Sequence, residues 1–236
     1  MSAAESIEQV AAELVAEFRD FYSDLGAASE RLAPPLRALL ADPTAAGRRA
    51  LQSLVEAEAQ RFLDAHPVAF AAGLLVGAAP GRPPVAPMVD WFLRTADGRP
   101  ARAEFVTDRD DLDFYDFERH PWFERTIEHG EPILSSPFID WLGVDEYIVT
   151  TMSPLPAQLV ERAMFGADIS IEAIEPSLLR ILRRAPVAAA VVNDADRIVV
   201  GSSATFLVGE QLRRGPGVRE IPLDAGPRGL RLVVAA

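Results

Sequence analysis

The sequence predicts an α+β fold in which N-terminal helices precede an antiparallel sheet with short flanking helices. Apolar residues recur at helical spacing over the first 65 residues, and short apolar segments separated by turn residues follow. The strand–helix alternation of a parallel sheet is missing. The 236 residues, 49% of them hydrophobic, are sufficient for a substantial buried core.

The first third of the chain is predicted to be helical. Residues 7–22 carry apolar side chains at steps of three and four, and Gly26 is a candidate stop for this helix. A second helix is expected at Ser29–Leu40. A third helix is expected at Ala45–Ala65, where the apolar pattern ends before Pro67.

Strands are expected in the remainder of the chain, together with a short helix after Pro121 and a helix at Ile171–Arg184. We divide the chain into a helical region (1–66), a sheet domain (67–184) and a small β lobe that completes the fold (185–236). After the apolar run Val68–Gly77, the predicted strands are Pro87–Arg94, Ala101–Thr107, Pro132–Leu134, Phe138–Trp141, Glu146–Ser153, Ala163–Ile169, Val187–Asn193, Arg197–Gly201 and Gly229–Val234.

Composition excludes several kinds of chemistry. All 23 basic residues are arginines and cysteine is absent, which removes lysine Schiff bases, P-loop lysines, thiol catalysis and thiolate metal sites. The three histidines are scattered and no G-x-G-x-x-G motif follows a strand, so we expect no cofactor and no metal. The net charge of −12 disfavours a nucleic-acid partner.

The sequence carries no recognisable targeting or membrane-spanning segment. Its first residues include Glu5, Glu8 and Glu13, where a signal peptide requires basic and then apolar residues. The longest apolar stretch, Pro67–Pro80, falls well short of the roughly 20 residues of a membrane span. We therefore expect a cytoplasmic protein without a membrane partner.

Aromatic and acidic residues gather between positions 115 and 168. The aromatic side chains alone are typical of a core, but Asp140 and Asp168 lie within apolar segments. Burying a carboxylate without a partner is costly, so each is expected to have one. The partner is either a backbone N–H or an arginine, or else a cationic ligand held over an aromatic face.

A series of short motifs occupies the same part of the chain. In order they are Phe114-Tyr115-Asp116-Phe117, Pro121-Trp122-Phe123, Ser135-Ser136-Pro137-Phe138-Ile139-Asp140, Glu146-Tyr147-Ile148-Val149-Thr150, Ser153-Pro154 and Phe165-Gly166-Ala167-Asp168-Ile169. This order and spacing resemble those of the Cache (PAS-like) ligand-binding domains of chemoreceptors and sensor kinases. The resemblance implies a PAS-like sheet that binds a ligand without catalysis.

The resemblance also implies a set of ligand-binding residues. In amino-acid-binding Cache domains, an arginine, a tryptophan and a tyrosine hold the ligand carboxylate, and a tyrosine and two aspartates hold its ammonium. Carried over to this sequence, the first tyrosine corresponds to Tyr115, the tryptophan to Trp122, and the two aspartates to Asp140 and Asp168. The ammonium-binding carboxylates are therefore both present.

The sequence departs from the family pattern at three positions. His120 stands in the place of the arginine, Phe123 replaces the second aromatic residue of its motif, and Phe138 replaces the tyrosine before the first aspartate. These changes favour an amine over an α-amino acid, unless protonated His120 or Arg94 meets a ligand carboxylate. Arg94 lies three residues after Trp91, so a regular strand places the two on opposite faces. Trp91 and Arg94 complete the candidate ligand-binding residues.

These observations lead to a primary hypothesis and two alternatives. We predict a non-enzymatic small-molecule sensor or binding protein for an amine or amino-acid-like ligand, freestanding and signalling through a separate partner. The N-terminal helices either mediate a homodimer or only cover the sheet. One alternative is an enzyme that uses Asp140 and Asp168 as an acid/base pair, and the other is an interaction module whose pocket no longer binds a ligand.

Overall fold

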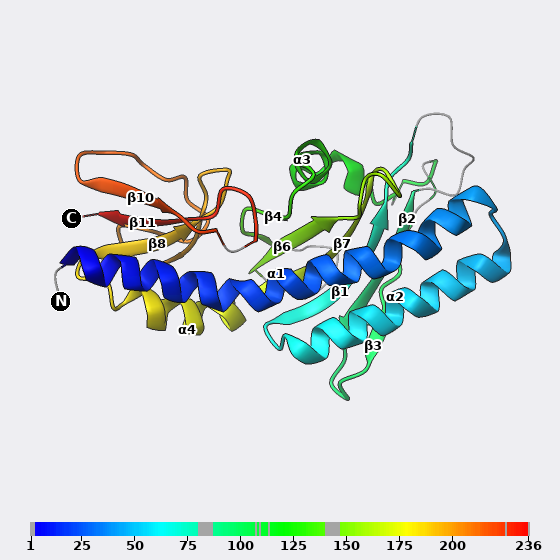
Figure 1. Ribbon diagram of the computed structural model, residues 1–236, viewed down its shortest axis with the longest axis horizontal. Helices are drawn as coiled ribbons and strands as arrows, with labels where there is room; N and C mark the ends of the chain where they lie inside the picture. Colours follow the sequence, from blue (N-terminus) through cyan, green and yellow to red (C-terminus); the bar gives the residue numbers. More distant parts are fainter. Residues whose placement is uncertain are drawn as a thin grey trace. The chain divides into compact units, whose positions relative to one another are not determined.

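Helices come first along the chain and strands dominate the rest (Figure 1), which confirms the predicted α+β class. The computed structural model describes residues 3–79, 87–106, 108, 110–112, 114–139, 147–224 and 226–235. Within these residues, no helix combines the length and the hydropathy needed to cross a membrane. The elements are α1 (Ala3–Ala41), α2 (Ala45–Ala65), β1 (Ala69–Val76), β2 (Met88–Arg94), β3 (Pro100–Arg102), η1 (Phe117–Arg119), α3 (Pro121–His129), β4 (Ile133–Leu134), β5 (Phe138–Ile139), β6 (Tyr147–Pro154), β7 (Ala163–Ser170), α4 (Ile171–Leu182), β8 (Ala188–Val192), β9 (Ile198–Gly201), β10 (Val218–Pro222) and β11 (Arg231–Ala235).

The strands form two sheets. The seven-stranded sheet has the order β3-β2-β1-β7-β6-β4, with β5 also paired to β6, and the four-stranded sheet has the order β10-β11-β8-β9. The pairs β1–β2, β2–β3 and β5–β6 are antiparallel, as are the three pairs of the smaller sheet. In the larger sheet β1 therefore lies between β2 and β7, so a side chain of β2 must extend across β1 to reach β7.

The chain divides into two compact units, each assembled from separate segments. The first unit comprises Met1–Tyr22, Ile133–Thr151 and Ile169–Ala236, and the second comprises Ser23–Pro132 and Met152–Asp168. The division at residues 66 and 184 stays a prediction.

The helix α1 is continuous, whereas the sequence predicts a stop at Gly26 and a new helix from Ser29. A glycine in a helix interior costs about 1 kcal/mol relative to alanine, and prolines cost more. The helix nevertheless contains Gly26, Pro34 and Pro35. Its apolar face runs through these positions, and its burial offsets the cost; the buried side chains are Leu25, Ala28, Leu32, Ala33, Leu36 and Leu39.

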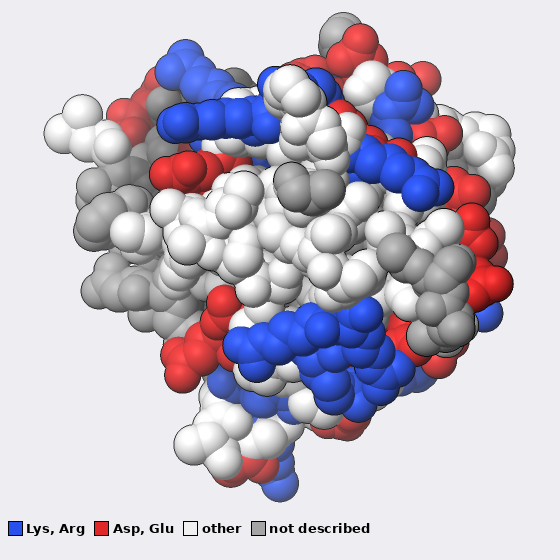
Figure 2. Space-filling model, turned by 90° about the vertical axis from the view of Figure 1, so that its left-hand side faces the viewer, with Lys and Arg blue, Asp and Glu red and all other residues white. Residues whose placement is uncertain are grey.

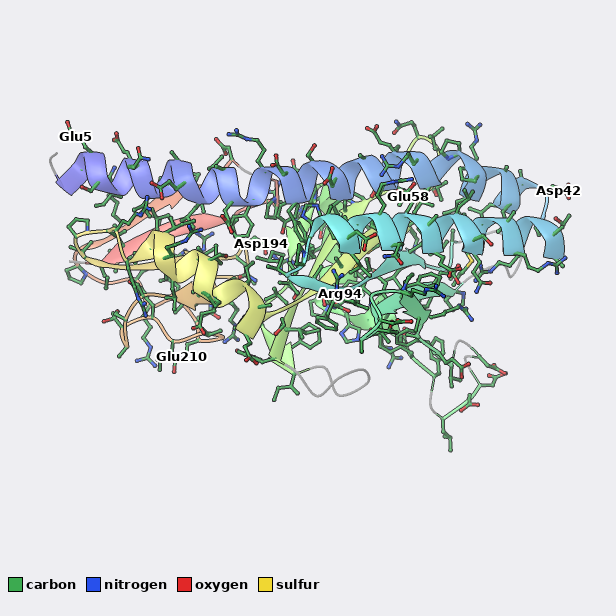
Figure 3. The ribbon with its side chains drawn as sticks, turned by 90° about the horizontal axis from the view of Figure 1, so that it is seen from below. Glu5, Asp42, Glu58, Arg94, Asp194 and Glu210 are labelled. Atoms are coloured by element: carbon green, nitrogen blue, oxygen red, sulfur yellow. The ribbon has the colours of Figure 1, made fainter. Side chains whose placement is uncertain are left out.

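The second unit is built on the packing of α2 against the larger sheet, where α2 contacts β1 and β2 (Figure 1). The helix begins and ends where the sequence predicts, and the Gly47 N–H donates to the Oγ1 of its N-cap residue Thr44 at 3.0 Å. Buried Glu58 on α2 lies on the side of that helix next to α1 (Figure 3). The guanidinium of Arg31 on α1 donates to both of its carboxylate oxygens at 3.0 and 2.7 Å. This ion pair joins the two helices.

The first unit contains the four-stranded sheet, with α4 packed against β9. The helix α4 and the hairpin β8–β9 confirm predicted elements, but β10 was not predicted. It is an edge strand that pairs only with β11 and has no fully buried residue, so its sequence lacks a clear apolar alternation. The core of the sheet consists of Ala190, Val192, Ile198, Phe206, Leu212 and Val233.

Several arginines of the first unit are held in ion pairs. Arg214 Nη1 and Arg231 Nη2 lie 2.7 and 2.5 Å from the two carboxylate oxygens of Asp196, and Arg184 Nη1 lies 2.6 Å from Glu13 Oε1. On the face shown in Figure 2, basic and acidic side chains lie beside one another around an uncharged area. This intermixing is consistent with the expectation of no nucleic-acid partner, which stays a prediction.

Candidate functional site

A buried carboxylate and an indole meet on the larger sheet within the second unit. Trp91 on β2 lies opposite Gly73 on β1, and a Cβ on Gly73 would lie 2.8 Å from Trp91 Cα and 2.9 Å from its ring atom Cε3. Because Gly73 has no side chain, the indole can lie across β1 and reach β7. Its Nε1–H donates to Asp168 Oδ2 at 2.8 Å, with both residues less than a tenth exposed.

This pair lies on the sheet face opposite α2. Asp90, the neighbour of Trp91, accepts two hydrogen bonds from the Arg48 guanidinium of α2 at 2.6 and 2.8 Å. Phe165, three residues before Asp168, has its ring 6.0 Å from that of Phe62 on α2. Because successive side chains of a strand alternate between faces, Trp91 and Asp168 point away from α2.

The helix α3 covers this second face. Strand alternation places Gly77, just after β1, on the same face as Gly73, and a Cβ on Gly77 would lie only 2.5 Å from Phe123 Cζ. The adjacent Ala78 N–H donates to Glu118 Oε1 at 3.0 Å. The segment that contains η1 and α3 is therefore fixed directly over the end of β1.

Aromatic rings of this covering segment stack on one another. His120 lies parallel to Trp122 with ring centroids 5.3 Å apart, and Tyr115 stacks on Phe105 at 4.8 Å. The ring centroids of Tyr115 and His120 lie 5.9 Å apart, so the two stacks are in contact. We call the Trp91–Asp168 pair, together with Tyr115, His120, Trp122 and Phe123 of the segment that packs on the same sheet face at the end of β1, the sheet-face site.

Arg162 clamps the covering segment to the sheet. Its Nη2 donates to Glu118 Oε1 at 3.0 Å and to Glu124 Oε1 at 3.1 Å, and its guanidinium carbon lies 5.1 Å from the centre of the Phe123 ring. Its carbonyl accepts the Gly77 N–H at 2.8 Å. No motif predicted this clamp, because its members come from three separate stretches of the chain.

The remaining candidate residues lie elsewhere. Arg94 is on the α2 side of the sheet, as strand alternation predicts, where it donates to the carbonyl of Leu63 near the end of α2 and to that of Ala69 at the start of β1. Phe138 is a half-buried residue of the first unit, opposite Ile148. Asp140 lies outside the described residues. The proposed ligand contacts of all nine candidates stay predictions.

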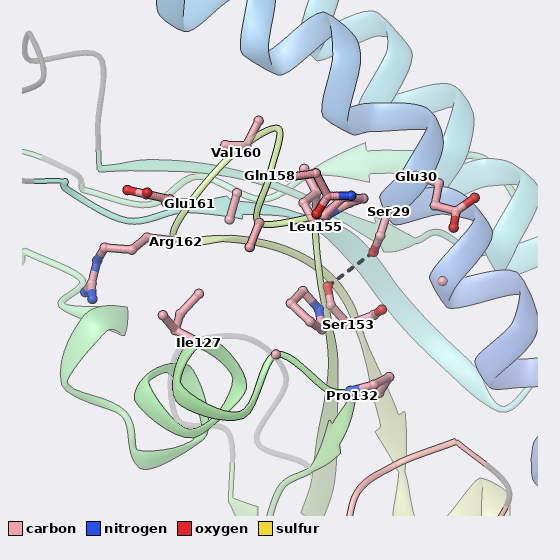
Figure 4. A pocket seen from close by; sticks show the side chains of 16 residues that line it. Ser29, Glu30, Ile127, Pro132, Ser153, Leu155, Gln158, Val160, Glu161 and Arg162 are labelled. Atoms are coloured by element: carbon pink, nitrogen blue, oxygen red, sulfur yellow. Dashed lines mark hydrogen bonds between the residues drawn. The ribbon is translucent and has the colours of Figure 1, made fainter.

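A second feature of the second unit was not predicted. A pocket of about 710 Å³, which we call the α1–β6 pocket, is lined by α1, the end of α3, and the end of β6 with the connection to β7 (Figure 4). Ser29 Oγ donates to the Ser153 carbonyl at 3.2 Å in its wall. The described residues contain no cluster of three or more histidine or acidic side chains placed to hold a metal ion.

The whole fold is similar to chemoreceptor ligand-binding domains of known structure. A methyl-accepting chemotaxis protein X superposes with a TM-score of 0.63 at 12% identity, covering 99% of this chain and 96% of that chain. The ligand-binding domain of Pseudomonas fluorescens chemoreceptor CtaA with L-isoleucine gives 0.53 at 17% identity, covering 97% and 88%. That of Pseudomonas aeruginosa amino acid chemoreceptor PctC with GABA gives 0.54 at 17% identity, covering 98% and 97%.

At these identities the similarity establishes the fold, which agrees with the Cache resemblance of the sequence motifs. No family model matches the chain, and no curated protein matches it.

Proposed function

We propose that this protein is a non-enzymatic sensor domain that binds an amine or amino-acid-like ligand at the sheet-face site. The observation that carries the proposal is the buried Asp168 carboxylate, oriented by Trp91 on the sheet face that the aromatic segment covers. The chemoreceptor domains with this fold support it, because L-isoleucine and GABA, the ligands in two of those structures, both carry an ammonium group.

The chemistry of the sheet-face site suits an ammonium group. The indole N–H is a neutral donor, so its bond orients Asp168 without cancelling the carboxylate charge. A bound ammonium would bring a positive charge to this buried carboxylate in a place shielded from water, where such pairs are strong. Stacked aromatic rings beside a cation add about 0.5–2 kcal/mol of attraction.

The expected ligand class depends on which residues could bind a carboxylate of the ligand. The residue in the place of the family arginine is His120, stacked on Trp122, and an imidazole lacks the permanent charge and the two-pronged donor geometry of a guanidinium. Arg94 is engaged with α2 on the other face of the sheet. We therefore propose that simple amines bind better than α-amino acids, and both better than carboxylates. A cytoplasmic location, a homodimer and a separate signalling partner also remain proposals.

A matched panel of three ligands tests the class. L-isoleucine, 2-methylbutylamine and 3-methylpentanoate share one side chain and differ only in their charged groups. A ligand at 100 times its Kd stabilises the folded protein by about 2.7 kcal/mol, which a thermal-shift assay detects readily. We expect the largest shift with the amine and none with the carboxylate. A largest shift with the carboxylate would contradict the proposal, and conversion of any ligand would favour the enzyme alternative.

A further inference from the structure

We propose that the α1–β6 pocket is a second ligand site, separate from the sheet-face site, which takes a small molecule with an apolar body and an amine group. Its volume of about 710 Å³ lies within the range of roughly 300–1,000 Å³ typical of small-molecule sites. None of its lining residues belongs to the sheet-face site.

The walls of the pocket are mainly apolar. The apolar lining residues come from α3 and its end, from the end of β6, and from the connection between β6 and β7; they include Ile127, Pro132, Pro154, Leu155, Pro156 and Val160. Ser29 and Ser153 provide polar groups that are already joined by a hydrogen bond (Figure 4). Such a lining buries the apolar body of a ligand and leaves few polar groups to fix its orientation.

Gly26 is a second, independent indication of a ligand. It lies in the interior of α1, where glycine costs about 1 kcal/mol relative to alanine. A close neighbour does not explain this glycine, because a Cβ on Gly26 would meet no atom of a neighbouring element within 4 Å. Gly26 lines the pocket, so the missing side chain leaves open space there. A ligand seated against α1 supplies the neighbour that explains the glycine.

The charges around the pocket favour a cation. Glu30 on α1 lines the pocket (Figure 4) and is exposed at its edge. The pocket's arginine, Arg162, is engaged by Glu118 and Glu124, which balance its charge. The pocket entrance therefore attracts an amine and repels a carboxylate, with each exposed pair contributing modestly.

The test compares two variants that differ in how far they fill the pocket. Gly26→Leu extends a side chain into the open space, whereas Gly26→Ala adds only a Cβ, and the two residues have similar helix propensities. The probe is 4-phenylbutylamine, titrated by calorimetry beside 4-phenylbutanol and 4-phenylbutyrate. We expect Gly26→Leu to bind the amine at least tenfold more weakly than Gly26→Ala, and the wild type to prefer the amine over the carboxylate by about threefold to tenfold.

The Asp168→Asn variant separates this inference from the proposed function. Binding of 4-phenylbutylamine in the α1–β6 pocket should change less than twofold in this variant, since Asp168 does not line the pocket. The second site would be overturned if Gly26→Leu and Gly26→Ala bound the amine with equal affinity, or if Asp168→Asn lost this binding. It would also be overturned if the wild type bound 4-phenylbutyrate more tightly than the amine, or did not bind the amine at all. None of these results removes the binding of 2-methylbutylamine at the sheet-face site.

Discussion

Replacing Trp91 by phenylalanine should destabilise the second unit through its effect on Asp168. The phenylalanine ring still covers Gly73, but it lacks the N–H that donates to Asp168 Oδ2 at 2.8 Å. Both residues are buried, at 6% and 8% exposed, so water does not easily replace the lost donor. A hydrogen bond to a charged group contributes about 1.5–3 kcal/mol, and the smaller ring loses about 1 kcal/mol of burial. We expect a total loss of about 3 kcal/mol in the free energy of unfolding.

A double-mutant cycle isolates the hydrogen bond from the loss of ring area. Asp168→Asn keeps an oxygen that accepts the indole N–H, but the bond is then between neutral groups and contributes about 1 kcal/mol. The cycle of Trp91→Phe, Asp168→Asn and the double variant should therefore give a coupling energy of about 1 kcal/mol in urea denaturation. Strictly additive effects would refute the reasoning, since they would mean that the carboxylate binds the indole N–H no more strongly than the amide oxygen of asparagine does.

Three further predictions use the same stability measurements. Arg162→Gln removes the ion pairs to η1 and α3 and the cation–π contact with Phe123. It should lower the free energy of unfolding by about 1 kcal/mol and speed amide hydrogen exchange first in α3. Unchanged exchange in α3 would contradict the clamp. Burial raises the pKa of Glu58, but hydrogen bonds from two arginines outweigh it and hold the pKa below its ordinary value of 4.5. A carboxyl group whose pKa is lower in the folded state than in the unfolded state stabilises the fold above its unfolded-state pKa, and this contribution is lost as the pH falls through the folded-state pKa. The wild type should therefore exceed Glu58→Gln in stability most above about pH 5, and the difference should shrink below about pH 4. A stability difference that does not change with pH would argue against this. Gly73→Ala should destabilise the protein by more than about 2 kcal/mol because its Cβ overlaps the β2 backbone, whereas Gly26→Ala should stabilise it by up to about 1 kcal/mol. Effects of the same sign would contradict the close contact at Gly73 or the open space at Gly26.

Local signals in the sequence predicted those elements whose ends depend on local chemistry. The helix α2 begins after the capping residue Thr44 and ends before Pro67, and both signals act within one turn of the helix. The continuity of α1 could not be predicted in this way. Gly26 and the two prolines favour an interruption locally, and only the burial of the whole apolar face in the folded protein overrides them.

The members of the sheet-face site were predicted individually, but their arrangement was not. The contact of Trp91 with Asp168 depends on β1 lying between β2 and β7 and on the glycine at position 73, and neither strand order nor register is written in a local pattern. The α1–β6 pocket was missed for a similar reason. Its walls come from distant segments, and Gly26 was interpreted as a helix stop although it lines a pocket.

The central claim is that the Asp168 carboxylate holds a ligand ammonium, and calorimetric titration of 2-methylbutylamine tests it most directly. The informative pair is Asp168→Asn and the control Asp64→Asn, an exposed aspartate of the same unit whose carboxylate also accepts one N–H, here from Gln60 at 2.7 Å. Asparagine keeps an acceptor oxygen in both positions, removes the charge and makes the same replacement of one oxygen by an NH2 group at each. We predict that Asp168→Asn weakens binding about thirtyfold, equivalent to about 2 kcal/mol, while Asp64→Asn binds as the wild type does. Equal affinities in the two variants would contradict the account.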